Sequence, residues 1–233
     1  SEGKLYSEDS PLKDGKIEIK YMTAKEEDIL TSQNLIKKGV VIDMLLDSLI
    51  LTPGITSDDL ILGDKNAVMV AARILAYGPE YPAEVIHPTT GNKSTHTFNL
   101  AECPFKKLPE GITNNEFEFE LPVSKQKVVF SLLTGKEEKD IVAELSANSK
   151  LGQQISKELT TRLRYTIKSV DGESSQTYIN EFVNNMLARD SKSLRNEIKR
   201  ISPDIELQQE VEIGGESVKV AIPMTVNFFW PNT

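Results

Sequence analysis

The sequence predicts an α+β fold with a helical core, several β-hairpins and an internal strand-plus-helix pseudo-duplication. Three observations lead to this fold class. Residues 11–27 return in modified form as residues 122–138, at a constant offset. Apolar residues recur every three or four positions over several stretches, as in amphipathic helices. Short alternating segments flank Gly214-Gly215, which is a typical two-residue hairpin connection.

In the duplicated segment, each copy has the pattern of a turn, a strand and the start of a helix. Thr23 is followed three residues later by Glu26, and Thr134 is followed in the same way by Glu137. This spacing is a capping box, in which the two side chains satisfy each other's backbone N–H groups. Alternating apolar residues precede each threonine and predict a half-buried strand in each copy.

The first half of the chain is expected to be mainly helical. Gly39 and Gly78 are expected to end helices, because glycine readily takes the left-handed conformation that follows a last helical turn. Asp64 has the side chain and the position of an N-cap. The elements expected here are a strand at 17–21, helices at 23–38, 40–51 and 65–77, and a hairpin of strands 83–87 and 94–100.

The second half follows a similar order of elements. Apolar residues that alternate with glutamates predict an amphipathic strand before the second copy of the duplication. An interruption near Asp190-Ser191 is expected to separate the last two helices. The elements expected here are strands at 117–119 and 128–132, helices at 134–146, 151–163, 178–186 and 194–201, and a hairpin of strands 206–213 and 216–222.

Length and composition restrict the classes of function. A chain of 233 residues can bury a core without disulfides. The net charge of −8 disfavours binding to nucleic acid or to an anionic membrane surface. The single cysteine fits a reducing compartment, and no apolar run approaches the roughly 20 residues of a membrane span. We therefore expect a cytoplasmic protein with no nucleic-acid partner and no membrane span.

The domain organisation follows from the duplication. Residues 1–10 are polar and are expected to form a flexible N-terminus. Residues 11–233 are expected to form a single α+β domain with two related halves, at about 11–110 and 111–233. The similar order of elements in the two halves favours one unit over two unrelated domains.

Few residues of this chain are classical ligands of transition metals. His87, His96 and Cys103 could hold zinc across a hairpin and, with the acidic clusters, serve a metal-dependent hydrolase. Their spacing matches no standard zinc knuckle, so a surface hairpin with two ordinary histidines is the favoured interpretation. Cys103 lacks the sequence context of a nucleophile and is typical of a small buried hydrophobe. We expect no catalytic residue, no metal and no cofactor.

Two carboxylate clusters lie in the duplicated segments, at Glu26-Glu27-Asp28 and at Glu137-Glu138. Paired carboxylates can perform acid–base chemistry or bind a metal. Each cluster lies in the first turn of an expected helix, where the helix dipole stabilises negative charge by roughly 0.3–1 kcal/mol. Helix capping therefore explains these carboxylates without a catalytic role.

The C-terminal segment contains three adjacent aromatic residues, Phe228, Phe229 and Trp230. Successive side chains of a strand point to opposite faces, so at least one of them must pack on a helix or on a partner. Aromatic residues are frequent hot spots of protein interfaces. The three residues are therefore candidates for partner contacts, and docking within the chain is an equal alternative.

Three stretches of the sequence together resemble a known family. They begin with Tyr21-Met22-Thr23, with Leu62-Gly63-Asp64 and with Ile222-Pro223-Met224. In this order they are similar to the T-even (T-four-type) bacteriophage baseplate hub assembly proteins, over nearly the whole chain. The resemblance implies a non-enzymatic phage protein that helps to assemble the hub of a contractile-tail baseplate. It would bind other phage baseplate hub proteins in the host cytoplasm.

Other functions stay open at this point. A structural baseplate subunit that is retained in the virion would have the same sequence features as an assembly factor. Homo-oligomers are compatible with either role. The metal-dependent hydrolase is the alternative from another functional class, and it would require His87, His96 and the acidic clusters to meet in one pocket.

One departure from the family concerns metal. Many members carry a Cys-Pro-x-Cys-Gly knuckle in the first hairpin and a similar pair in the last, which together resemble a four-cysteine zinc ribbon. This chain has His87-Pro88-Thr89-Thr90-Gly91 at the first place and Glu212-Ile213-Gly214-Gly215 at the second. The turn glycines are present and the ligands are not, so the resemblance implies that this member has lost the metal. Its hairpins must then be held by apolar packing across the strands.

Overall fold

The computed structural model describes residues 1–233 except 87–90, 92, 151–155, 214, 224–227 and 230–233. Helices and small antiparallel sheets form an α+β fold, as predicted. The chain divides into two compact units, each with its own hydrophobic core. Unit 1 comprises Ser1–Lys16, Ser57–Leu62 and Leu108–Ser202, and unit 2 comprises Ile17–Thr56, Gly63–Lys107 and Pro203–Thr233. Both units are assembled from separate segments, and the division into continuous halves near residue 110 stays a prediction.

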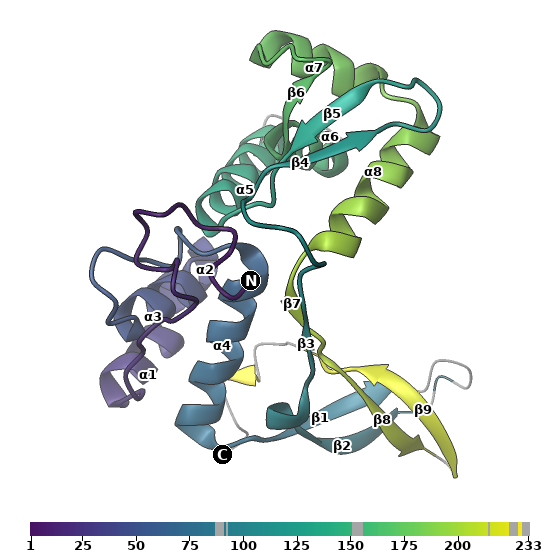
Figure 1. Ribbon diagram of the computed structural model, residues 1–233. Helices are drawn as coiled ribbons and strands as arrows, with labels where there is room; N and C mark the ends of the chain where they lie inside the picture. The colour runs from purple at the N-terminus through teal and green to yellow at the C-terminus, as the bar shows by residue number, and fades with distance from the viewer. Residues whose placement is uncertain (87–90, 92, 151–155, 214, 224–227, 230–233) are drawn as a thin grey trace. The chain divides into compact units, whose positions relative to one another are not determined.

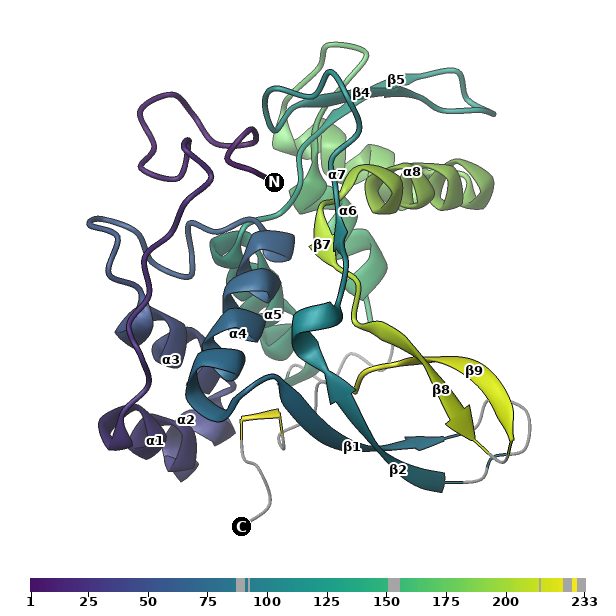
Figure 2. The same cartoon turned by 60° about the horizontal axis from the view of Figure 1, so that its bottom comes forward.

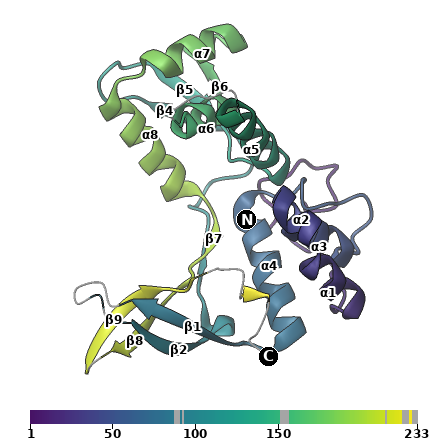
Figure 3. The ribbon, with the colours of Figure 1, turned by 180° about the vertical axis from the view of Figure 1, so that it is seen from behind.

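Unit 2 contains the helices of the N-terminal half (Figures 1 and 3). They are α1 (Ala24–Thr31), α2 (Gln33–Lys38), α3 (Val41–Leu49) and α4 (Leu62–Tyr77), the last of which begins at the boundary with unit 1. The single helix predicted at 23–38 is wrong, because the chain turns to an extended conformation at Ser32. Helix α2 buries none of its residues, so little packing opposes this break. Gly39 ends α2 in the left-handed conformation, as predicted.

Helix α4 begins earlier than the sequence indicates. Asp64 lies within its first turn and is not its N-cap, which corrects the prediction. Gly63, in the same first turn, lies so close to the backbone of Pro203 that a Cβ at this position would collide with the carbonyl oxygen of Pro203. This approach of two chain segments, distant in sequence, could not be read from local capping signals.

Two hairpins complete unit 2, and both were predicted (Figure 2). They consist of β1 (Glu80–Ile86) with β2 (Lys93–Asn99), and of β8 (Gln208–Ile213) with β9 (Glu216–Ala221). Tyr81 lies opposite Phe98 in the first hairpin, and Val211 lies opposite Val218 in the second. These apolar cross-strand pairs agree with the expected way of holding the hairpins together.

Shorter elements join these parts. The predicted strand at 17–21 is wrong, because only Ile19 pairs, in an isolated bridge with Ile50. Its partner Ile50 is the extended residue that directly follows α3, and the backbone hydrogen bonds of the bridge, from Lys20 N–H to the Leu49 carbonyl and from Leu51 N–H to the Glu18 carbonyl, do not continue into a ladder. A 3-10 helix η1 (Leu100–Glu102) leads to β3 (Phe105–Lys106), and β3 pairs with β7 (Asp204–Ile205). Strands of two residues have no detectable periodicity in the sequence.

Unit 1 is built on a three-stranded antiparallel sheet of β4 (Phe117–Glu120), β5 (Lys127–Phe130) and β6 (Ile167–Val170). Its helices are α5 (Gly135–Lys150), α6 (Glu158–Thr166), α7 (Gln176–Asn185) and α8 (Ala188–Ile201). Figure 1 shows these four helices around the sheet. The core joins the sheet to α6, α7 and α8 through Val128, Phe130, Val170, Leu163, Ile179, Val183 and Leu194.

In unit 1, three elements differ from the predictions. Strand β6 was not predicted, because it follows directly on the last residue of α6. Helix α6 begins at Glu158, and residues 151–155 of the predicted helix lie outside the described residues. The break between α7 and α8 lies at Met186-Leu187 and not at Asp190-Ser191. Asp190 lies inside α8, where its buried carboxylate accepts two backbone hydrogen bonds.

The N-terminal residues, which were expected to be flexible, take part in the fold of unit 1. Leu5 is buried in the core, and the Tyr6 hydroxyl accepts a hydrogen bond from the backbone N–H of Ile61 at 3.0 Å. Both residues stand alone in a polar stretch, so no periodic pattern marks them.

Candidate functional site

Both predicted capping boxes are present. Thr23 and Glu26 form the box at the start of α1. At the start of α5, the Thr134 N–H donates to the Glu137 carboxylate at 2.9 Å, and the Glu137 N–H donates to the Thr134 hydroxyl at 3.4 Å. The glutamates of the duplicated segment therefore cap helices, as the sequence indicates.

The Glu26 carboxylate is fully buried and accepts four hydrogen bonds. Lys20 Nζ donates at 2.7 Å, Ser48 Oγ at 2.8 Å, and the N–H and hydroxyl of Thr23 at 3.0 and 2.5 Å. The Lys20 ammonium and then Thr23 lower the pKa of Glu26 far below its usual range, and they outweigh the effect of burial. A carboxylate held charged in this way is a structural acceptor and a poor general base.

Arg73 is a second buried charge in unit 2, and no sequence pattern indicates it. Its guanidinium donates to the carbonyl oxygens of Gly78 and Glu80, just beyond the end of α4, at 3.0 and 3.2 Å. It also lies over the rings of Tyr77 and Tyr81, at 5.1 and 5.7 Å from their centroids. Arg73 therefore closes the C-terminus of α4, where a positive charge is favoured.

The C-terminal aromatic residues occupy the core of unit 2 as far as they are described. Phe228 packs edge-on against Tyr81 with ring centroids 5.2 Å apart, and it makes a similar contact with Phe229. Both phenylalanines are buried, which corresponds to docking within the chain. A partner could reach them only if the segment left this core. Trp230, the third candidate, lies outside the described residues.

The structure does not bring the expected metal-ligand types together among the residues it describes. The His96 ring packs edge-on against Phe98, with centroids 5.0 Å apart. Cys103 is buried, and burial raises the pKa of its thiol. The described part of the chain contains no group of three or more His, Cys, Asp or Glu residues that could hold a metal ion. His87 lies outside it, and the loss of the family's metal stays a prediction.

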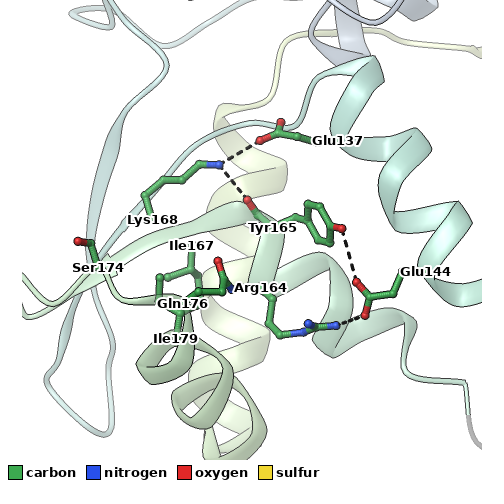
Figure 4. Close-up of a pocket in the computed structure, with 9 residues that line it drawn as sticks. All are labelled: Glu137, Glu144, Arg164, Tyr165, Ile167, Lys168, Ser174, Gln176 and Ile179. Atoms are coloured by element: carbon green, nitrogen blue, oxygen red, sulfur yellow. Dashed lines mark hydrogen bonds and ion pairs between the residues drawn. The ribbon is translucent and has the colours of Figure 1, made fainter. Parts of the chain in front are cut away.

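A polar pocket of about 500 Å³ opens in unit 1 between α5, α6 and the start of α7 (Figure 4). Arg164 pairs with Glu144, and the Tyr165 hydroxyl approaches the same carboxylate at 3.5 Å. Lys168 donates to Glu137 and to the backbone carbonyl of Tyr165, both at 3.0 Å. Ionic groups of both signs therefore line the pocket in pairs.

The chemistry of this pocket suits binding better than catalysis. The pKa of the Tyr165 hydroxyl is raised by burial and by the charge of Glu144, so the phenol stays protonated and is a poor general base. Glu137 already caps α5, and Glu144 already holds Arg164. Neither histidine nor cysteine occurs among the described residues that line the pocket. Paired charges around a hollow can recognise a polar surface segment of another protein.

A second hollow, of about 240 Å³, lies on the other side of α7. We call it the α7 groove, and its described lining consists of Ser124, Gln126, Tyr178, Glu181, Phe182, Asn185, Met186, Leu187 and Asp190. The buried Asp190 carboxylate accepts the backbone N–H groups of Val123 and Ser124 at 2.8 and 3.0 Å. This contact fixes the turn between β4 and β5 against the first turn of α8.

Comparison with known proteins identifies the family. Residues 5–230 match the family described as T4 bacteriophage base plate protein. The chain belongs to this family. Among curated proteins and among solved structures, no significant match was found.

Membership in this phage baseplate family, with nearly the whole chain matched, confirms the resemblance at the level of the baseplate. It points to a structural, non-enzymatic protein that interacts with other baseplate components. In the described part of this baseplate protein, the helices are too short or too polar to cross a membrane.

Proposed function

We propose that this baseplate protein assists the assembly of the contractile-tail baseplate hub by binding other hub proteins in the host cytoplasm, without catalysis. The observation that carries the proposal is the α7 groove, around which exposed apolar side chains gather on a protein of a multi-subunit family. Exposed apolar patches on otherwise polar surfaces commonly mark protein interaction sites. The paired charges of the polar pocket add a second surface that suits a protein partner.

The test compares infected cells with purified particles. Affinity capture of a tagged chain from infected cells should recover baseplate proteins, and infection without the gene should leave incomplete baseplates. Mass spectrometry of purified phage should then find far less than one copy of the chain per baseplate. Recovery of no tail or baseplate protein would contradict the proposal.

A structural subunit retained in the virion is the second candidate, and the family membership favours it. The particle measurement separates the two functions. A fixed number of copies in every purified baseplate would establish the structural role and exclude an assembly factor that leaves the complex.

Trp230 is the residue of the aromatic tail that we propose for partner contact, because its neighbours Phe228 and Phe229 are buried. Trp230→Ala should weaken binding to a baseplate partner and leave the thermal stability of the protein unchanged. Equal loss of binding and stability would instead assign the indole to the core.

A further inference from the structure

Exposed apolar side chains in unit 1 are concentrated around the α7 groove. The large hydrophobic residues that are exposed in the described part of this unit are Val123, Val142, Leu159, Tyr178 and Leu187. Tyr178 and Leu187 line the groove, 37% and 51% exposed, and Val123 adjoins it in the turn next to Ser124. Phe182 and Met186 add half-buried apolar surface to its floor. This local concentration indicates an interaction surface.

The groove is built from fixed parts. Its wall from the β4–β5 turn is held by the Asp190 carboxylate, which is buried and accepts two backbone N–H groups. Helix α7, which forms the opposite wall, is anchored to the core by Ile179 and Val183. A preformed surface loses little conformational entropy when a partner binds, which favours affinity.

Size and charge restrict what the groove can bind. A volume of about 240 Å³ is below the roughly 300–1,000 Å³ that small-molecule pockets usually have, and it suits one or two protein side chains. Glu181 is the exposed charged residue among the described lining residues, and that lining includes no lysine or arginine. Within the described chain, no ion pair or hydrogen bond to the Glu181 carboxylate is present, so a positive group of a partner could pair with it.

We propose that the α7 groove docks a segment of another baseplate protein that presents one large apolar side chain next to a lysine or arginine. The apolar side chain fills the space between Tyr178, Phe182 and Leu187, and the cation pairs with Glu181. This inference rests on the proposed function and specifies the surface and the chemistry of its partner.

The first arm of the test removes the apolar contact. Leu187→Asp is compared with Leu159→Asp, because Leu159 is 45% exposed and lies on α6 outside the groove lining. Each variant is titrated against the other baseplate proteins of the same phage, produced singly. We expect Leu187→Asp to weaken one complex about tenfold or more and Leu159→Asp to change it less than about twofold.

The second arm reverses the charge at the rim. Glu181→Lys is compared with Glu116→Lys, which makes the same charge change at an exposed position outside the groove lining. We expect Glu181→Lys alone to weaken the complex, about three- to tenfold, and the effect to shrink as salt concentration rises. Circular dichroism and thermal melts of all four variants confirm that each is folded before binding is compared.

The outcomes separate this inference from the proposed function. If the wild type binds a baseplate protein and both groove variants behave like their controls, the docking site is wrong and the proposed function stands. If Glu181→Lys strengthens binding, the partner segment is acidic and the stated chemistry is wrong. If Leu187→Asp changes the mass of the protein alone in sedimentation, a second copy occupies the groove and the proposal is overturned. If no baseplate protein binds the wild type, the proposed function fails and this inference fails with it.

Discussion

Glu26 combines two roles, because its carboxylate caps α1 and also holds a charge in the core of unit 2. It accepts hydrogen bonds from Lys20, Thr23 and Ser48 and is fully buried. An amide at this position would keep one acceptor oxygen and would turn an NH₂ group toward a donor. We expect Glu26→Gln to lower the free energy of unfolding at pH 7 by about 2–4 kcal/mol, measured by urea denaturation.

The pH dependence of this effect has a definite sign. Because the pKa of Glu26 is lowered by folding, its contribution to stability is complete above the unfolded pKa of about 4.3 and is lost as pH falls through and below that value. The difference in free energy of unfolding between the wild type and Glu26→Gln should therefore become smaller as the pH is lowered from 7 to about 3. Glu137→Gln is the control, because Glu137 lies in the second capping box and is more exposed. We expect it to lower the free energy of unfolding by only about 1 kcal/mol. Equal losses at the two positions would contradict this ranking.

Gly135 is required by a close contact and not by its backbone angles. A Cβ at this position would collide with the backbone carbonyl oxygen of Ser57. Two hydrogen bonds hold the segments together there, from the Gly135 N–H to the Leu60 carbonyl and from the Lys136 N–H to the Asp58 carbonyl, at 2.8 and 2.9 Å. Overpacking of this kind costs roughly 1–3 kcal/mol, more than the ~1 kcal/mol by which alanine favours a helix over glycine.

We therefore expect Gly135→Ala to destabilise the protein, by about 1–2 kcal/mol in urea denaturation. Ser146→Ala, at an exposed position of the same helix, should change stability by less than about 0.5 kcal/mol. A more stable Gly135→Ala variant would show that α5 can move away from Ser57 without loss.

At the level of elements, the β4–β5 hairpin depends on a residue of α8. Asp190 accepts the N–H groups of Val123 and Ser124 through its two carboxylate oxygens. Burial would raise the pKa of Asp190, but these backbone donors outweigh it and lower the pKa. Asp190→Asn places an amide NH₂ against a backbone N–H and leaves that donor without an acceptor. We therefore expect this variant to have a free energy of unfolding about 2–3 kcal/mol lower than that of the wild type.

Hydrogen exchange measures this loss where it occurs. The amides of Val123 and Ser124 should exchange much faster in Asp190→Asn than in the wild type. Glu181→Gln, an exposed change on the neighbouring α7, should leave both amides as they are. Unchanged protection in Asp190→Asn would mean that the turn is held by other contacts.

The elements that the sequence predicted correctly are those determined by local spacing. Both capping boxes depend on residues three positions apart, and both late hairpin strands depend on alternation around Gly214-Gly215. The predictions that failed depend on distant partners. The segment around Ile19 has a strand-like pattern, but it pairs only through one isolated bridge to Ile50, which directly follows α3. Helix α4 begins before Asp64, and its residue Gly63 lies against the backbone of Pro203, a contact that no local spacing indicates.

The candidate site could not be predicted from the sequence, because it also depends on residues that are distant in sequence. The α7 groove combines the β4–β5 turn with α7 and the start of α8, and the spacing of its apolar residues predicts a helix but not which of them are exposed. Tyr178, Phe182 and Met186 follow one another at intervals of four, but only part of this stripe faces the core. Burial of Ile179 and Val183 beside it shows which face of α7 is internal.

At the level of the whole molecule, two separate cores stabilise the chain. Each unit draws residues from segments far apart in sequence, and the last described residues of the chain belong to the core of unit 2. The C-terminal phenylalanines therefore pack in the same core as Leu30 of α1. Phe228 lies against Tyr81, whose hydroxyl donates to the Pro223 carbonyl at 2.9 Å.

Phe228→Ala tests this arrangement. Loss of a buried phenylalanine costs roughly 3–5 kcal/mol, and we expect that loss to appear in the hydrogen exchange of unit 2, for example at Val211. Val128 in the core of unit 1 should keep its protection, because the two clusters of buried residues are distinct. Equal loss of protection at Val128 would show that the two cores unfold as one cooperative unit. Unchanged exchange at Val211 would contradict the docking of the aromatic segment and would return Phe228 to the candidates for partner contact.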